Sequence, residues 1–391
     1  MDISGFFKPV NPAFAGNTES YHPRQFANWI HTHRDNHFPD LEKVQVAIMG
    51  VREERKAINN EGCSNAPDTI RKQLYQTFAD FGSIKGVDLG DVEAGHTIDD
   101  TYFALSATIA ELVGKKVIPI IIGGSHDLAF ANYMAYEKLE QTLNIVTIDS
   151  TLNLGLAKDD ELNAGSFLGK IIMRKPNFLF NYSSIAYQTY LTDPEAVHLM
   201  RNLHFDCHRL GEVQSAISEM EPAIRNADLF SFDMAAIRMS DAPGTGQASP
   251  NGLFGQEACK LMRYAGLSEK ISSVGIYECN PLLDRNEQTA GLAAQMIWYF
   301  IEGVSGRKYD FPFTDSSHYI TYRVNISDHP QELVFYKSKK SDRWWMNVPF
   351  LSDHGSKYER HHMVPCSYRD YEQACQDDLP DRWWQAYQKL N

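Results

Sequence analysis

The alternation of continuously apolar segments with amphipathic ones limits the possible folds of this chain more than any other feature of its sequence. The apolar segments are rich in β-branched residues, as strands buried on both faces are. We predict such strands at 44–50, 115–124, 143–150, 228–234 and 271–279. We predict helices at 66–78, 101–115, 127–139, 253–266 and 289–303. This order predicts a mostly parallel central sheet with helices on both faces, a three-layer α/β/α architecture.

The chain changes character after about residue 307. We therefore predict an α/β domain at 41–307, an N-terminal segment at 1–40 that packs on it, and a C-terminal extension at 308–391. In the extension, 319–326 and 332–348 favour an antiparallel pair of strands, and two short helices follow. No low-complexity linker precedes the extension, so we expect it to pack on the main domain.

Tryptophan is concentrated in the extension, where the tetrapeptide Asp-Arg-Trp-Trp occurs twice. The two copies place four of the six tryptophans there: Trp344, Trp345, Trp383 and Trp384. Buried tryptophans commonly attach an appended segment to a main domain, whereas exposed ones anchor protein partners. Both roles stay open, and the second predicts a protein partner for the extension.

Charge and cysteine usage exclude several classes of protein. The formal charge is −13, from 37 basic and 50 acidic residues, which argues against a nucleic-acid partner. No segment approaches the ~20 apolar residues of a membrane span, and the N-terminus does not resemble a secretory signal. The six cysteines are widely spread with no C-x-x-C pair, which suits reduced thiols. We expect a cytoplasmic protein without a membrane span.

Three predicted strands end in polar residues. Their ends read GGSHD (123–127), DSTLN (149–153) and SFDMA (231–235). Ligands of open parallel sheets bind at the carboxyl ends of the strands, so His126, Asp149 and Asp233 can converge there as ligands of a divalent metal ion. The alternative is structural: the two aspartates cap backbone donors, and the histidine begins a helix without binding metal.

In order and spacing these segments resemble those of the ureohydrolases, the family of arginase, agmatinase and formimidoylglutamase. The family pattern runs G-G-x-H, D-x-H-x-D, S-x-D-x-D with A-P-G, and a glutamate before N-P. The corresponding segments here are GGSHD, DSTLN, SFDMAAIRMSDAPGTG and ECNPLLDRNEQTAG. NEGCSNAPDTIRKQL (60–74) and VDLGDV (87–92) are also similar to the family. The resemblance covers roughly residues 40 to 305 and implies an arginase-like fold.

The resemblance also implies a centre of two manganese ions with six protein ligands, where a metal-bridging hydroxide attacks a guanidinium or amidine carbon. Three ligand positions are matched here by His126, Asp149 and Asp233, the second of which is the catalytic candidate if the chain is active. A fourth position holds Asn153 in place of an aspartate, which makes a weak ligand. Thr151 replaces the second histidine and Ala235 replaces the last aspartate. Because the last two positions serve the second metal, we expect none or a single Mn²⁺.

Two further positions are informative through the resemblance. Glu278 corresponds to the glutamate that pairs with the cationic amidine of the substrate, which predicts that a small cationic ligand still binds. Its alternative role is that of a buried partner of an arginine. Leu168 stands where arginases have a proton-transferring histidine, and this departure speaks against arginase only. Cys279, beside the glutamate, is predicted to be a small core residue.

Two other histidine-containing segments invite a metal interpretation. The first is HFDCH, with His204 and His208 four positions apart, and the second is the tail segment 353–366, which includes His361. Solvated loops or sheet edges are the simpler interpretation of both.

Two hypotheses of function follow. In the first, the chain has lost the dimanganese site and acts as a non-catalytic binding or scaffolding protein. In the second, it is an active formimidoylglutamase-like hydrolase of linear amidines that uses one metal, or ligands supplied by the tail. The resemblance also implies a homo-oligomer.

Overall fold

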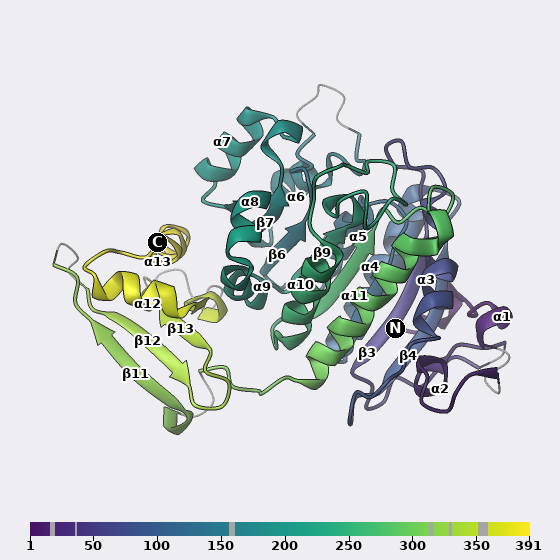
Figure 1. Cartoon of the computed structure of the whole chain (residues 1–391), viewed down its shortest axis with the longest axis horizontal. Coiled ribbons are helices and arrows are strands. Elements are labelled where there is room, and N and C mark those ends of the chain that lie inside the picture. Colours follow the sequence, from purple (N-terminus) through teal and green to yellow (C-terminus); the bar gives the residue numbers. More distant parts are fainter. Residues whose placement is uncertain (16–19, 36, 156–160, 313–315, 328–330, 351–358) are drawn as a thin grey trace.

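The computed structural model describes the chain except for residues 16–19, 36, 156–160, 313–315, 328–330 and 351–358 (Figure 1). A ten-stranded sheet forms its centre, in the order β1-β4-β3-β5-β10-β9-β6-β7-β8, with β2 also paired to β4. Only β1 runs antiparallel to its neighbour. The strands are β1 (Phe7–Lys8), β2 (His31–Thr32), β3 (Val46–Arg52), β4 (Gly86–Glu93), β5 (Ile118–Ile122), β6 (Leu143–Ile148), β7 (Leu179–Tyr187), β8 (Asp206–Arg209), β9 (Leu229–Asp233) and β10 (Ser273–Tyr277).

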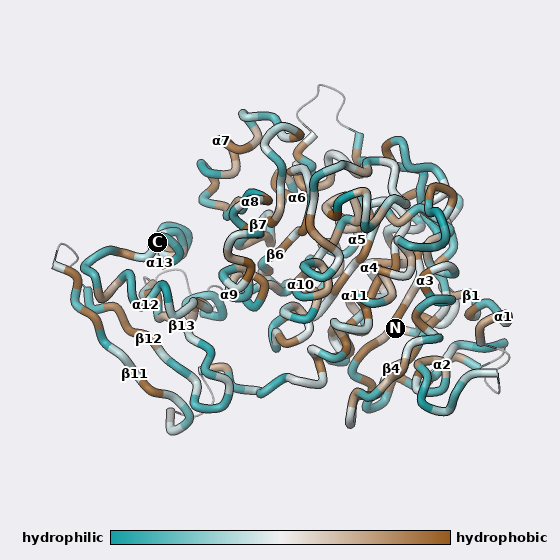
Figure 2. Tube along the Cα trace, viewed as in Figure 1, coloured by the Kyte–Doolittle hydropathy of each residue, from teal (hydrophilic) through white to brown (hydrophobic). Residues whose placement is uncertain are grey.

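Helices cover both faces of this sheet, so the predicted three-layer α/β/α fold is confirmed. One face packs against α3 (Ala66–Leu74), α8 (Leu210–Ser215), α9 (Glu221–Arg225), α10 (Gly255–Leu267) and α11 (Gln288–Ser305). The other packs against α4 (Ile98–Gly114), α5 (Leu128–Lys138), α6 (Phe167–Met173) and α7 (Pro194–Asn202). Hydrophobic residues follow the central strands and the inner sides of the helices (Figure 2).

Local sequence explains where two of these helices begin. Pro67 lies in the first turn of α3, where its missing N–H removes no helical hydrogen bond. The helix α4 is preceded by Thr97, whose hydroxyl accepts from the backbone N–H of Asp100, while the Asp100 carboxylate accepts from the backbone N–H of Thr97. None of the helices in the described part of the chain is both long and apolar enough to cross a membrane.

The N-terminal residues are built into this domain. The strands β1 and β2 both pair with β4, and the side chain of Phe26 in α2 (Phe26–Trp29) is fully buried in the same core as α3 and α11. A further short helix, α1 (Pro12–Ala15), precedes them.

The extension has a sheet of its own with four antiparallel strands where the sequence predicted two. Its order is β11 (Tyr319–Val324), β12 (Leu333–Ser338), β13 (Trp344–Asn347) and β14 (Met363–Cys366). The predicted second strand, 332–348, turns back on itself between β12 and β13. The strand β14 escaped notice because it is short and contains Pro365, which weakens a strand pattern. The two expected helices are α12 (Tyr368–Cys375) and α13 (Asp381–Leu390).

The extension docks at the amino ends of the central strands. The Arg225 guanidinium, in α9, lies 4.4 Å from the ring centre of Trp345 and donates to the carbonyls of Trp344 (3.0 Å) and Cys366 (3.3 Å). Arg360 donates to the carboxylate of Asp228 at 2.5 Å, just before β9. The extension is therefore attached by guanidinium groups that reach buried acceptors on both sides of the contact.

Three of the four tryptophans of the repeated tetrapeptide are buried in the extension or at its contact with the main domain. Trp344, Trp345 and Trp383 are buried, so three of the four cannot form the partner surface considered above. They pack against the core of the extension or against the main domain because their indole rings bury a large apolar area. Only Trp384 is exposed, at 46%, and the role of this residue as a partner anchor stays a prediction.

Removing the Arg225 guanidinium is expected to loosen the extension. In Arg225→Met the acceptors at Trp344 and Cys366 lose their donor, and an unsatisfied buried acceptor costs about 1–3 kcal/mol. We expect the tryptophan fluorescence to report a transition at lower urea concentration than in the natural chain. Arg323→Gln is the matched control, since Arg323 forms an exposed ion pair with Glu332 within the extension. Equal midpoints for the two variants would contradict the role given to Arg225.

Candidate metal centre

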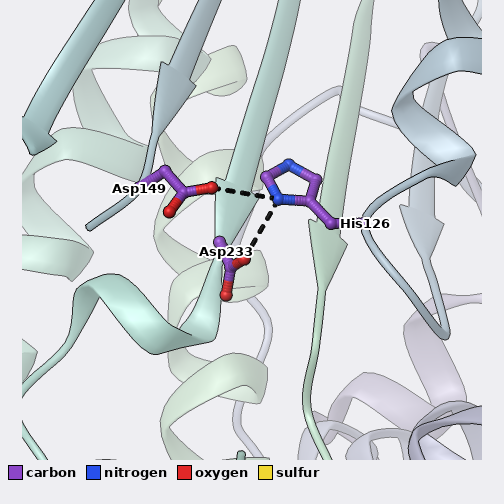
Figure 3. A group of neighbouring side chains, drawn as sticks. All are labelled: His126, Asp149 and Asp233. Carbon is purple, nitrogen blue, oxygen red and sulfur yellow. Dashed lines mark hydrogen bonds and ion pairs between the residues drawn. The ribbon is translucent and has the colours of Figure 1, made fainter. Parts of the chain in front are cut away.

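Three neighbouring strand ends bring His126, Asp149 and Asp233 together (Figure 3). His126 follows β5, Asp149 directly follows β6, and Asp233 is the last residue of β9. The histidine Nδ1 lies 3.2 Å from an oxygen of Asp149 and 3.0 Å from an oxygen of Asp233. The strand-end rule thus predicted this convergence correctly.

The surroundings of His126 fix its ring. Its Nε2 lies 2.8 Å from the Ser231 hydroxyl, two residues before Asp233 on β9. The ring of Tyr277 stacks on the imidazole at 5.1 Å, and Phe167 packs on it at 4.6 Å. The hydroxyl contact leaves Nδ1 facing the two carboxylates, an orientation typical of metal-binding histidines. Sequence reasoning missed Ser231, although its position in the S-x-D segment was a usable signal.

The site is almost closed to solvent. The side chains of His126, Asp149 and Asp233 are 1%, 2% and 10% exposed. Burial opposes a charge on the imidazole, but the hydrogen bonds to Asp149 and Asp233 raise the pKa of His126 to about 10. The protonated imidazole therefore balances the two carboxylates, and a metal ion at this place would take over that charge as it displaced the proton.

The three side chains fit one divalent ion. Their donor atoms lie within 4.8 Å of one another, and the shortest separations are near 3 Å. Ligand atoms bound at about 2.1 Å in adjacent octahedral positions are separated by about 3 Å. One imidazole nitrogen and two carboxylate oxygens also suit Mn²⁺ and similar divalent ions.

The same surroundings do not fit a second ion. Ala235 is 2% exposed and ends in a methyl group, while its backbone N–H donates to Asp233 at 2.7 Å. Thr151 donates its hydroxyl to the Asn153 side-chain oxygen at 2.8 Å. Asn153 in turn donates its amide to Asp149 at 2.6 Å, through the nitrogen and not through a ligand oxygen. The residues at these positions are satisfied by one another and offer no anionic ligand set.

Glu278 lies directly after β10, beside the triad, and is 5% exposed. One carboxylate oxygen accepts from the backbone N–H of His126 at 2.7 Å, and the other from the Asn60 amide at 2.6 Å. No arginine in the described part of the chain bonds to it, so the alternative of an arginine partner is wrong. Burial and the charge of Asp233 raise the pKa of Glu278 to about 8. Asn60 escaped the sequence analysis because its partner is 218 positions away.

An arginase-family model matches residues 44–302. The chain belongs to the arginase family. A formimidoylglutamase of Staphylococcus aureus (strain MSSA476) is 26% identical over 282 residues, which cover 68% of this chain and 90% of that protein. Formimidoylglutamase of Bacillus subtilis has the same fold, with a TM-score of 0.65 and 19% identity. The match covers 72% of this chain and 92% of that one. The structure of Trypanosoma cruzi formiminoglutamase with Mn²⁺ is also similar, with a TM-score of 0.63 and 20% identity. The match covers 69% of this chain and 97% of that one.

The match places the extension outside the family domain, and His361, the ligand candidate in the described part of the extension, does not reach the site. His361 lies 3.0 Å from the hydroxyl of Thr142, just before β6, whereas Asp149 follows the other end of that strand. Seven residues of strand separate these positions by roughly 20 Å. The idea that His361 supplies a ligand is therefore wrong. Residues 353–358 of the same segment lie outside the described part of the chain.

The remaining candidates lie away from the triad or act structurally. Leu168, in α6, is buried, and its backbone N–H donates to the Asn153 carbonyl at 3.1 Å, so it holds the loop that carries Asn153. Cys279 is 1% exposed and belongs to the main core. His204 lies two residues before the edge strand β8 and His208 lies within it, and neither belongs to a group among the described residues that could hold a metal.

Proposed function

We propose that this arginase-family chain binds at most one divalent metal ion and acts as a non-hydrolytic binding protein. The single observation that supports this is the exchange of the second-metal ligands for Ala235 and Thr151. Two adjacent metal ions generate and hold a hydroxide nucleophile at neutral pH, and a lone ion with three protein ligands lacks the partner for that geometry.

The state of Glu278 supports the same proposal. In the family resemblance this carboxylate pairs with a cationic amidine. Here its two oxygens accept from the Asn60 amide and from the backbone N–H of His126. A cationic substrate would therefore compete with two existing donors for this carboxylate.

A mononuclear amidine hydrolase is the second candidate. It is favoured by the geometry of His126, Asp149 and Asp233, which retains one complete face of metal ligands at the strand ends. The similarity to formimidoylglutamases makes N-formimidoyl-L-glutamate the first substrate to assay.

Metal content after manganese loading and removal of excess is the deciding measurement. We expect no more than one Mn²⁺ per chain by elemental analysis, and none in Asp233→Asn. This substitution removes a carboxylate ligand and leaves the side-chain size nearly unchanged. We expect no hydrolysis of N-formimidoyl-L-glutamate above the blank. Two ions per chain, or manganese-dependent hydrolysis lost in Asp233→Asn, would overturn the proposal. One ion with hydrolysis would establish the mononuclear candidate.

A further inference from the structure

A pocket of about 440 Å³ lies where the extension meets the edge of the central sheet. One wall comes from β7, β8 and the α8–α9 region, and the other from β14, α12 and α13. The pocket includes none of the triad residues, and its size is that of a small-molecule site. It exists only because the extension is docked.

The wall from the α/β domain carries acidic groups. Asp206, on the edge strand β8, accepts from the Ser183 hydroxyl (2.8 Å) and the Asn181 amide (3.1 Å) through the same oxygen. Its other oxygen receives no hydrogen bond from the described residues. Burial opposes its charge, but Lys389 and His208 hold the pKa of Asp206 below its ordinary value. Glu212 and Glu219 extend this wall.

The wall from the extension carries guanidinium and ammonium groups. Arg382, on α13, has a buried Nε without a hydrogen-bond acceptor in the described chain, and the nearest carboxylate oxygen, on Asp370, is 3.5 Å away. Lys389, about two turns further along the same face of α13, donates to the side-chain oxygen of Asn181, and its charge acts on Asp206. Arg369 also lines this side. The extension side also carries Asp370, which forms an ion pair with Arg382, and Asp381, so groups of both charges line the pocket.

We propose that this pocket binds a small zwitterion of the α-amino acid type. The ammonium group donates to the free oxygen of Asp206, and the carboxylate accepts from the terminal N–H groups of Arg382, whose side chain is 23% exposed. Charge-assisted hydrogen bonds of this kind are the stronger ones in proteins, and a ligand with both charges satisfies both walls at once. Because it contacts both parts of the chain, the ligand stabilises the docked extension.

The test uses the full chain and calorimetric titration with each of the common L-amino acids in turn. We expect at least one to bind below ~10 mM and to raise the thermal midpoint. The same titration is then run with two analogues of that amino acid, one without the ammonium group and one without the carboxylate. Each analogue is expected to bind at least about tenfold more weakly.

Variants locate the site independently of the analogues. Asp206→Asn and Arg382→Gln each remove one charge at nearly constant size and are expected to weaken binding at least about tenfold. Arg323→Gln, on the far strand β11, is the matched control and keeps the natural affinity. The proposal is overturned if no amino acid binds, if either analogue binds as tightly as the parent, or if both pocket variants keep full affinity. Should a variant fail to fold, the analogue series alone decides.

Discussion

The triple variant Thr151→His, Asn153→Asp and Ala235→Asp is expected to bind two manganese ions per chain, where we expect the natural chain to bind no more than one. The substitutions return an imidazole and two carboxylates to the positions at which this arginase-family chain has none. Each added anion faces the existing triad, so repulsion between carboxylates is relieved only when a second cation is present. Stoichiometry after manganese loading, by elemental analysis, is the measurement.

Stability gives this prediction a second readout. Position 235 is buried, so an aspartate there without a metal is an uncompensated buried charge. The metal-free triple variant is therefore expected to melt at a lower temperature than the natural chain and to regain stability when manganese is added. The natural chain is expected to respond much less to the same addition.

Asn153→Asp alone is the matched control for the triple variant. It improves only the first ligand set, because the Asn153 amide now donates to Asp149 where an aspartate would offer oxygen. One ion per chain, bound more tightly than in the natural chain, is the expected result. If the triple variant keeps the stoichiometry of this control, the second position has closed by repacking and the explanation from missing ligands fails.

Much of the fold was readable because strands buried on both faces are continuous apolar runs. The strand β4 was harder to recognise because Asp88 and Asp91 interrupt its pattern. Their charges are balanced in the interior by Arg71, which lies on α3, and Asp91 also pairs with Arg52. The strand β7 contains Asn181 and Ser183, whose partner Asp206 lies on the neighbouring strand. Pairings between distant positions leave no signal in a local window.

The residues of the candidate site also include some that the sequence predicted and some that it did not. His126, Asp149 and Asp233 were predictable because the carboxyl ends of parallel strands share one edge. The contacts of Ser231 and Asn60 were not, since both depend on through-space approach to residues on other strands. The sequence also did not show on which side of the sheet the extension docks. Because it docks at the amino ends of the strands, His361 lies at the opposite end of β6 from the triad.

The largest loss of stability is expected from Arg71→Met, which keeps side-chain volume and removes a fully buried guanidinium. Arg71 donates two 2.8 Å bonds to the carboxylate of Asp88, one bond to Asp91 and one of 2.9 Å to the Gly90 carbonyl. The methionine leaves two carboxylates in the interior with much of their compensating charge gone. Breaking one side of a buried ion pair costs about 3–5 kcal/mol, and we expect a decrease of this size in the free energy of unfolding.

The pH dependence distinguishes this electrostatic cause from a packing defect. Burial opposes ionisation of Asp91, but Arg71 and Arg52 hold its pKa below the ordinary value. Its contribution is therefore present above the ordinary carboxyl pKa of about 3.9 and is lost as the pH falls through the lowered value. In Arg71→Met the Asp91 carboxylate protonates at higher pH than in the natural chain, which relieves its repulsion with the neighbouring Asp88.

The difference in unfolding free energy between the natural chain and Arg71→Met is therefore expected to be largest near pH 7 and to narrow as the pH approaches 4. Urea unfolding followed by circular dichroism at several pH values measures it. Arg323→Gln loses only an exposed ion pair and is expected to cost less than about 1 kcal/mol at every pH. A pH-independent difference for Arg71→Met would indicate that lost packing, and not the unpaired carboxylates, causes the destabilisation.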